Sequence, residues 1–246
     1  MIDIHCHILP RVDDGPRSMG ESLTMLRKMA LEGITHVVAT PHCNENLPLF
    51  RKEILGHVEK LNSGIARMGI DVEILPGSEI TLFNIRRYRK NFERGLFCHL
   101  GDNPKYSLLE FPWQSDKVPR GALELAQWVA AQGTTLIVAH PERTPYLRDN
   151  RDALHALVEA GAWLQITVDS LIGTNTPVAQ TVADELIAQY PNIVLASDSH
   201  NFNRCSGLVA GYDAVRERFG PERADDLKAR ADVILQHIAP SPWRVL

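Results

Sequence analysis

Short apolar runs recur along the chain, and most follow a helix-like stretch that ends in glycine. Such glycines stand at positions 33, 69, 133 and 161, and glycine closes a helix in the left-handed conformation without steric penalty. Short, nearly continuous apolar runs indicate strands that are buried on both faces. The runs predict strands at residues 2–5, 36–40, 72–77, 106–110, 135–139, 163–167 and 193–197.

Helices fit between most of these strands. Ser18 and Glu21 form a capping-box pattern, and apolar residues follow at helical spacing from Leu23 onward. Strands that alternate with helices are typical of a parallel α/β fold. No low-complexity linker divides the chain, so we expect one barrel domain over residues 1–246 with about seven βα units. The less regular stretch Thr81–Asn103 is expected to decorate one end of the barrel.

Composition and charge exclude several classes of protein. The 246 residues are 44% hydrophobic and carry a net charge of −4, which disfavours non-specific nucleic-acid binding. Cys6, Cys43, Cys98 and Cys205 form no CxxC pair, so reduced thiols in the cytoplasm are the simplest interpretation. The sequence shows neither a signal-peptide pattern nor a long apolar run, so membrane insertion is not expected.

Side chains that can bind metal follow six of the predicted strands. The C-terminal ends of parallel barrel strands converge on one face, where active sites form. Imidazole and carboxylate together suit Zn, Mn or Fe. These side chains outnumber the ligands of one ion, which indicates a site with two or three metals, suited to phosphoryl displacement. The candidates are His5, His7, Asp13, Asp14, His42, Glu79, Glu110, His140, Asp198 and His200.

Each of these residues alone could be a structural, hydrogen-bonded core residue. Their shared position at strand ends favours the metal site, because buried imidazoles and carboxylates are costly without partners. The remaining histidines do not share this position, and we expect them to be structural or exposed. They are His36, His57, His99, His155 and His237.

These motifs resemble the PHP (polymerase and histidinol phosphatase) superfamily, and most closely its bacterial capsule and exopolysaccharide protein-tyrosine phosphatases. The resemblance covers nearly the whole chain. It implies a single distorted (β/α)7 barrel of the PHP type, with the active site at the C-terminal ends of the strands. The motifs are residues 3–10 with 13–15, 39–42, 77–80, 109–111, 139–143 and 196–201.

The resemblance also implies three divalent metal ions, usually Mn2+ in this branch, with iron or zinc as alternatives. His5, His7, Glu79 and Asp198 would bind the first ion; Glu79, Glu110 and His140 the second; and Asp14, His42 and His200 the third. Arg143 would hold phosphate oxygens. Arg204 is a second candidate for that role, although its spacing from His200 looks one residue shorter than in some relatives.

The implied activity is hydrolysis of a phosphomonoester by attack of a metal-bound hydroxide. The implied substrate is the phosphotyrosine-bearing tail of a bacterial tyrosine kinase of capsule or exopolysaccharide synthesis. A cysteine mechanism is excluded, because none of the four cysteines is followed by arginine six residues later. The basic segment Ile85–Arg94 is either a solvated helix face or a docking surface for an acidic tail.

Three alternatives remain open at the level of sequence. The first is a PHP phosphatase for a small metabolite such as histidinol phosphate. The second is a barrel amidohydrolase, which also opens with His-x-His but commonly bridges its metals through a modified lysine where this chain has Glu79. The third is a non-catalytic regulator on the same fold, which the intact set of candidate ligands disfavours.

Overall fold

The computed structural model describes residues 1–113 and 115–236. Every strand pair in these residues is parallel, as predicted. The strands are β1 (Ile2–Cys6), β2 (His36–Ala39), β3 (His42–Cys43), β4 (Glu73–Pro76), β5 (Glu79–Thr81), β6 (Tyr106–Glu110), β7 (Thr135–Ala139), β8 (Trp163–Thr167) and β9 (Ile193–Ala196).

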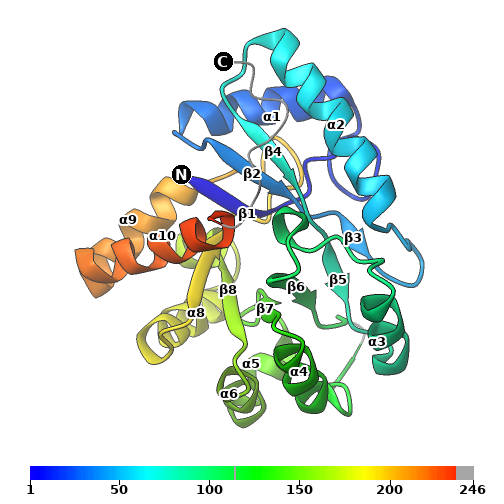
Figure 1. Cartoon of the computed structure of the whole chain (residues 1–246). Helices are drawn as coiled ribbons and strands as arrows, with labels where there is room; N and C mark the ends of the chain where they lie inside the picture. The colour runs from blue at the N-terminus through cyan, green and yellow to red at the C-terminus, as the bar shows by residue number, and fades with distance from the viewer. Residues whose placement is uncertain (114, 237–246) are drawn as a thin grey trace.

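The helices lie around the outside of the strands (Figure 1). Among the described residues, no helix combines the length and apolar composition that are needed to cross a membrane. The helices are α1 (Met19–Leu31), α2 (Arg51–Met68), α3 (Ile85–Glu93), the 3₁₀ helix η1 (Leu100–Asp102), α4 (Ala122–Ala131), α5 (Pro145–Arg148), α6 (Arg151–Glu159), α7 (Val168–Leu171), α8 (Pro177–Gln189), α9 (Leu208–Phe219) and α10 (Pro221–Leu235).

Two of the predicted strands differ from the structure, because each continues as a second short strand in another sheet. The sheets have the orders β1-β2-β4 and β3-β5-β6-β7-β8-β9. Pro41 separates β2 from β3, and Gly77 separates β4 from β5. Proline cannot donate to a strand ladder. A Cβ at Gly77 would lie 2.7 Å from Val38 Cγ1, so glycine permits a close approach of the two strands at this break.

The first and last strands of the chain also lie side by side. Cys6 forms an isolated parallel bridge with Ser199. The His7 amide donates to Ser199 O and the Asp198 amide donates to His5 O, both at 2.9 Å. This β1–β9 seam joins the three-stranded sheet to the six-stranded sheet.

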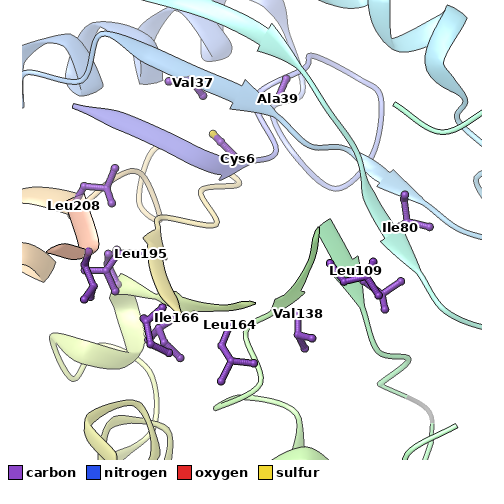
Figure 2. Close-up of a cluster of buried hydrophobic side chains, with 14 of the residues drawn as sticks. Cys6, Val37, Ala39, Ile80, Leu109, Val138, Leu164, Ile166, Leu195 and Leu208 are labelled. Atoms are coloured by element: carbon purple, nitrogen blue, oxygen red, sulfur yellow. The ribbon is translucent and has the colours of Figure 1, made fainter. Parts of the chain in front are cut away.

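The strands are buried on both faces, as their apolar runs predict. Alternate residues of β7 enter two separate clusters: Val138 packs in one, and Ile137 and Ala139 pack in the other. The larger cluster contains helix residues and strand side chains such as Leu109 and Leu195 (Figure 2). The smaller cluster consists mainly of strand residues, with Ile234 of α10 beside them.

The predicted helix boundaries are confirmed where a cap was identified. Helix α1 begins after Ser18, whose hydroxyl accepts from the Glu21 amide at 3.2 Å. The reciprocal contact differs from the capping-box pattern, because Glu21 accepts from the amide of Arg17 at 2.8 Å. The glycines that follow α1, α2, α4 and α6 all have positive φ, between 59° and 94°.

The stretch Thr81–Asn103 is more regular than predicted. It contains α3, which begins after Asn84, whose side-chain oxygen accepts from the Arg87 amide at 3.0 Å. Tyr88 is the buried residue of this helix. The predicted domain of residues 1–246 includes 237–246, and with them His237, which lie outside the described residues.

Candidate metal centre

Nine of the ten candidate side chains converge in one cluster. Most of them end or follow a strand, as predicted, but His42 and Glu79 are the first residues of the short strands β3 and β5. The nitrogen and oxygen atoms of the nine side chains form four overlapping groups, and within each group the atoms lie within 4.8 Å of one another. The tenth, Asp13, belongs to none of these groups, but its Oδ2 lies 2.7 Å from His7 Nδ1. The groups are His7, Asp14, His42 and His200; His5, Glu79 and His140; His5, His7 and Asp198; and His42, Glu79 and Glu110.

Glu79 lies at the centre of the cluster. Its Oε1 is 2.9 Å from His140 Nε2, and its Oε2 is 2.9 Å from His42 Nδ1. Each oxygen also lies 3.4 Å from an Nε2 atom, that of His5 or His7. Burial alone would raise the pKa of the Glu79 carboxyl, but the surrounding imidazoles, His5 above all, hold it well below its usual range.

Asp198 joins the histidines to two arginines. Its Oδ1 lies 3.4 Å from the Nε2 atoms of both His5 and His7. Its Oδ2 accepts from the guanidinium groups of Arg143 and Arg204. The structure therefore brings both predicted arginines to the cluster.

Two further carboxylates of the cluster differ in exposure. Glu110 is buried; it accepts from Thr81 Oγ1 at 2.8 Å and from Trp113 Nε1 at 2.6 Å. The side chain of Asp14 is 64% exposed, and its Oδ1 lies 3.4 Å from His200 Nε2 and 3.6 Å from His42 Nε2. The cluster thus extends from the interior to the surface.

The sequence did not indicate which residues orient the first two histidines. His7 Nδ1 donates to Asp13 Oδ2 at 2.7 Å, and His5 Nδ1 donates to Gln165 Oε1 at 2.9 Å. Asp13 was only a candidate ligand, and Gln165 was overlooked. Gln165 stands as a polar residue inside the apolar run of β8, a signal that could have identified it.

These contacts test whether the cluster suits a metal. When Nδ1 donates to an oxygen, the neutral form of each ring has its lone pair on Nε2, and the Nε2 atoms of His5 and His7 lie 3.2 Å apart. Two such nitrogens beside buried carboxylates favour a cation between them, either a proton or a metal ion. Burial alone would lower the pKa of both imidazoles, but the carboxylates accordingly raise it. Neutral imidazole with carboxylate is a donor set that suits Mn, Fe or Zn, so the residues fit divalent metal ions.

Two residues of the cluster have a strained backbone. His140 directly follows β7 with φ 33°, and Asp198 lies just beyond β9 with φ 51°. Residues other than glycine rarely adopt this left-handed region, and it costs about 1 kcal/mol or more. Strain of this kind concentrates at functional sites, and here it lies at two residues whose side chains enter the cluster.

The cysteines lie apart from this chemistry. All four are buried and unpaired, and burial in the core raises the pKa of the Cys6 thiol. A reactive cysteine needs a lowered pKa and access, so the structure agrees with the exclusion of a thiolate nucleophile.

The four described histidines outside the cluster lie in structural or exposed positions, as predicted. His36 Nε2 lies 3.8 Å from Glu73 at the start of β2, His57 is within α2, and His155 pairs with Glu159 on α6. Burial lowers the pKa of His99, which precedes η1, to about 4.

Sequence comparison finds a match along almost the whole chain. A family model described as capsular polysaccharide synthesis, CpsB/CapC, matches residues 1–235. The tyrosine-protein phosphatase YwqE of Bacillus subtilis is 34% identical over 242 residues, which span 96% of this chain and 92% of that protein. The tyrosine-protein phosphatase CpsB of Streptococcus pneumoniae is 26% identical, over 92% of this chain and 94% of that protein.

Structural comparison agrees with the sequence matches. A crystal structure from a study of YwqE from Bacillus subtilis and CpsB from Streptococcus pneumoniae, described there as metal-dependent tyrosine phosphatases, superimposes with a TM-score of 0.90. The identity is 32%, and the match covers 97% of this chain and 96% of the other.

Proposed function

The chain belongs to the CpsB/CapC family of capsular polysaccharide synthesis, and on that premise we propose that it is a metal-dependent protein-tyrosine phosphatase. One observation carries this proposal. The Nε2 atoms of His5 and His7 converge beside Glu79 and Asp198, and the same Asp198 holds two arginines. Groups that suit divalent cations and groups that suit a phosphoryl anion therefore lie in one cluster.

We further propose that the two sheets form one distorted (β/α)7 barrel and one catalytic domain. The breaks at Pro41 and Gly77 divide two of its seven strands, and the β1–β9 seam supports closure of the ring. A barrel of this kind would place all the candidate ligands on one face.

The proposed centre holds three divalent ions, with Mn2+ the expected metal. His5, His7, Glu79 and Asp198 would hold one ion; Glu79, Glu110 and His140 another; and Asp14, His42 and His200 the third. The groups of nitrogen and oxygen atoms support this division in part. The third set forms one group, to which His7 is added, and the first set without Glu79 forms another. Glu79, however, is grouped with His140 and His5 in one group and with Glu110 and His42 in another. Bound ions would ionise a water molecule near neutral pH and offset negative charge on the phosphoryl group.

The chain's own residues would then bind and orient the substrate. Arg143 and Arg204 present guanidinium groups beside the cluster, and a guanidinium matches phosphate oxygens as a bidentate fork. Asp198 holds the two arginines in place before substrate arrives, which reduces the side-chain entropy lost on binding. The phenolate of tyrosine is a good leaving group, so little acid catalysis is required.

The proposed substrate is the phosphotyrosine-bearing tail of a bacterial tyrosine kinase that controls capsule or exopolysaccharide synthesis. The family membership and the names of the relatives support this assignment. We expect the protein to act in the cytoplasm, and its four unpaired buried cysteines agree with a reducing compartment.

The test compares phosphate release from a phosphotyrosine peptide and from histidinol phosphate, with added Mn2+ and with a chelator. We expect turnover of the peptide with Mn2+ and none with the chelator. Glu79→Gln should lower kcat by about a hundredfold or more, since it weakens the central ligand. Glu185→Gln, which alters a surface pair with Arg151, is the control. A clear preference for histidinol phosphate would indicate a phosphatase for a small metabolite instead. Full activity with the chelator would refute the metal mechanism.

A further inference from the structure

Trp113 is an exposed aromatic residue in direct contact with the candidate metal centre. It lies just beyond β6 and is 41% exposed. Its indole Nε1 donates to Glu110 Oε1 at 2.6 Å. Its ring stacks on the His140 ring with centroids 5.4 Å apart and an interplanar angle of 29°. The guanidinium carbon of Arg143 lies 5.5 Å from the centroid of the indole.

The indole contacts residues with two different proposed roles in the site. Glu110 and His140 are candidate metal ligands, and Arg143 is a candidate phosphate-binding residue. In an aryl phosphate, a single ester oxygen separates the aromatic ring from phosphorus. A side chain that contacts this ring must therefore lie beside the groups that hold the phosphoryl oxygens, and Trp113 does.

The indole is also held in position before any substrate binds. The hydrogen bond to Glu110 and the stacking on His140 restrict both of its side-chain torsions. Binding to a fixed aromatic surface loses little side-chain entropy. Aromatic rings attract one another in offset or edge-to-face arrangements beyond what burial of area alone supplies, and an alkyl group lacks this attraction.

We propose that Trp113 is a specificity-determining residue, which contacts the phenyl ring of the substrate and selects aryl over alkyl phosphomonoesters. This inference rests on the proposed phosphatase function. The exposed part of the indole packs against the ring of the substrate, while its N–H keeps Glu110 oriented.

The first test measures kcat/KM for phenyl phosphate and for glycerol phosphate in the Mn2+-loaded protein. The readout is the ratio of the two values. Trp113→Leu should lower this ratio about tenfold, which corresponds to the binding free energy of one aromatic contact together with the area that it buries. Trp113→Phe, which keeps a ring but loses the bond to Glu110, should keep the ratio within about threefold of wild type.

Phe202→Leu is the matched control. Phe202 is 49% exposed, and its ring lies 5.5 Å from Lys28 Nζ. Its loss should leave the aryl-to-alkyl ratio unchanged.

The second test measures binding without turnover. Calorimetry would compare phenylphosphonate with methylphosphonate, and metal analysis would establish that each variant retains its Mn2+. We expect Trp113→Leu to weaken the binding of phenylphosphonate selectively. If it weakened both phosphonates equally, or lost Mn2+ while its aryl preference survived, Trp113 would only position Glu110 and the inference would be wrong.

Failure of the proposed function gives a different result. If the wild-type protein turned over neither phosphotyrosine nor phenyl phosphate, the proposed phosphatase function would be refuted. Under the same conditions, binding of phenylphosphonate that depends on Trp113 would still support the aryl site. An active phosphatase whose aryl preference survives Trp113→Leu would refute the inference alone.

Discussion

The orientation of single side chains decides what the cluster can bind. Asp13 and Gln165 each accept from an Nδ1 atom, and this fixes the tautomers of His7 and His5. A histidine whose second nitrogen donates to a carboxylate or amide is a better and more rigid metal ligand. Asp13 also accepts from the backbone amide of His42 at 3.1 Å. One carboxylate therefore orients the ring of His7 and the backbone of His42, which are both candidate ligands.

Asp13→Ala should therefore weaken Mn2+ binding about 10- to 100-fold, the usual effect of losing such a partner. The change removes the acceptor of His7 Nδ1, so the ring is free to rotate and to exchange tautomers. Calorimetric titration of the chelator-treated protein would measure the affinity.

Asp213→Ala serves as the control for this substitution, because Asp213 pairs with Arg216 on the surface of α9. Equal Mn2+ affinities in wild type and Asp13→Ala would mean that Asp13 does not set the orientation of His7.

The sequence could predict the candidate ligands that converge but not the residues that support them. Glu79, His140 and Asp198 stand one to three residues after strands β4, β7 and β9, and parallel strands bring such positions together. Gln165 contacts His5, 160 positions away, and Trp113 contacts His140 and Arg143 as well as the nearby Glu110. Local patterns do not encode the distant contacts. The sequence signal for Gln165 is a polar residue within an apolar run, whereas the exposure of Trp113 becomes evident only in the structure.

Among the elements, those with local signals were predicted best. The cap at Ser18 and the glycines after helices were confirmed, because both depend only on residues nearby in the chain. The division of two strands at Pro41 and Gly77 depends on which distant strand each half pairs with. Helix α3 agrees with the helix-face interpretation of the basic segment: Ile85, Tyr88 and Phe92 stand at helical spacing after Asn84.

The basic charges of α3 are partly neutralised by the rest of the structure. Arg87 lies 3.4 Å from Glu45, and Arg89 donates to the carbonyl of Glu124 and lies over the ring of Trp128. These contacts support the interpretation of this segment as a solvated helix face that is attached to the barrel through Tyr88.

Helix α1 offers a test at this scale. Ser18→Ala should lower the free energy of unfolding by about 1 kcal/mol, because the Glu21 amide loses its acceptor at the helix N-terminus. Urea denaturation followed by circular dichroism would measure the change.

The control is Ser63→Ala within α2, where the serine hydroxyl donates to Glu59 O. Alanine is the better helix former at such an interior position, so this change should be neutral or slightly stabilising. A cap that contributes nothing would give the two variants the same midpoint.

The whole molecule combines an apolar interior with an unusually polar centre. His5, His7, Glu79 and Asp198 are each at most 2% exposed. Burying such groups is costly unless they are paired or bind metal. The apolar clusters on both sides of the strands must therefore stabilise the fold against this centre whenever no metal is bound.

Removal of metal should consequently lower the melting temperature. A ligand at about 100 times its Kd stabilises the folded state by about 2.7 kcal/mol. For a domain of this size, that corresponds to a shift of about 5–10 °C. Differential scanning calorimetry with Mn2+ and with a chelator would measure it, and identical melting curves would contradict a metal centre within the fold.

The β1–β9 seam has a consequence for biosynthesis. His5 and His7 are synthesised long before Asp198 and His200, because translation proceeds from the N-terminus. The hydrogen bonds between Asp3 and Ser197 span 194 positions. Contacts between such distant residues form late and slow folding. The full cluster therefore cannot assemble until the ribosome has passed His200, although its first two histidines emerge much earlier.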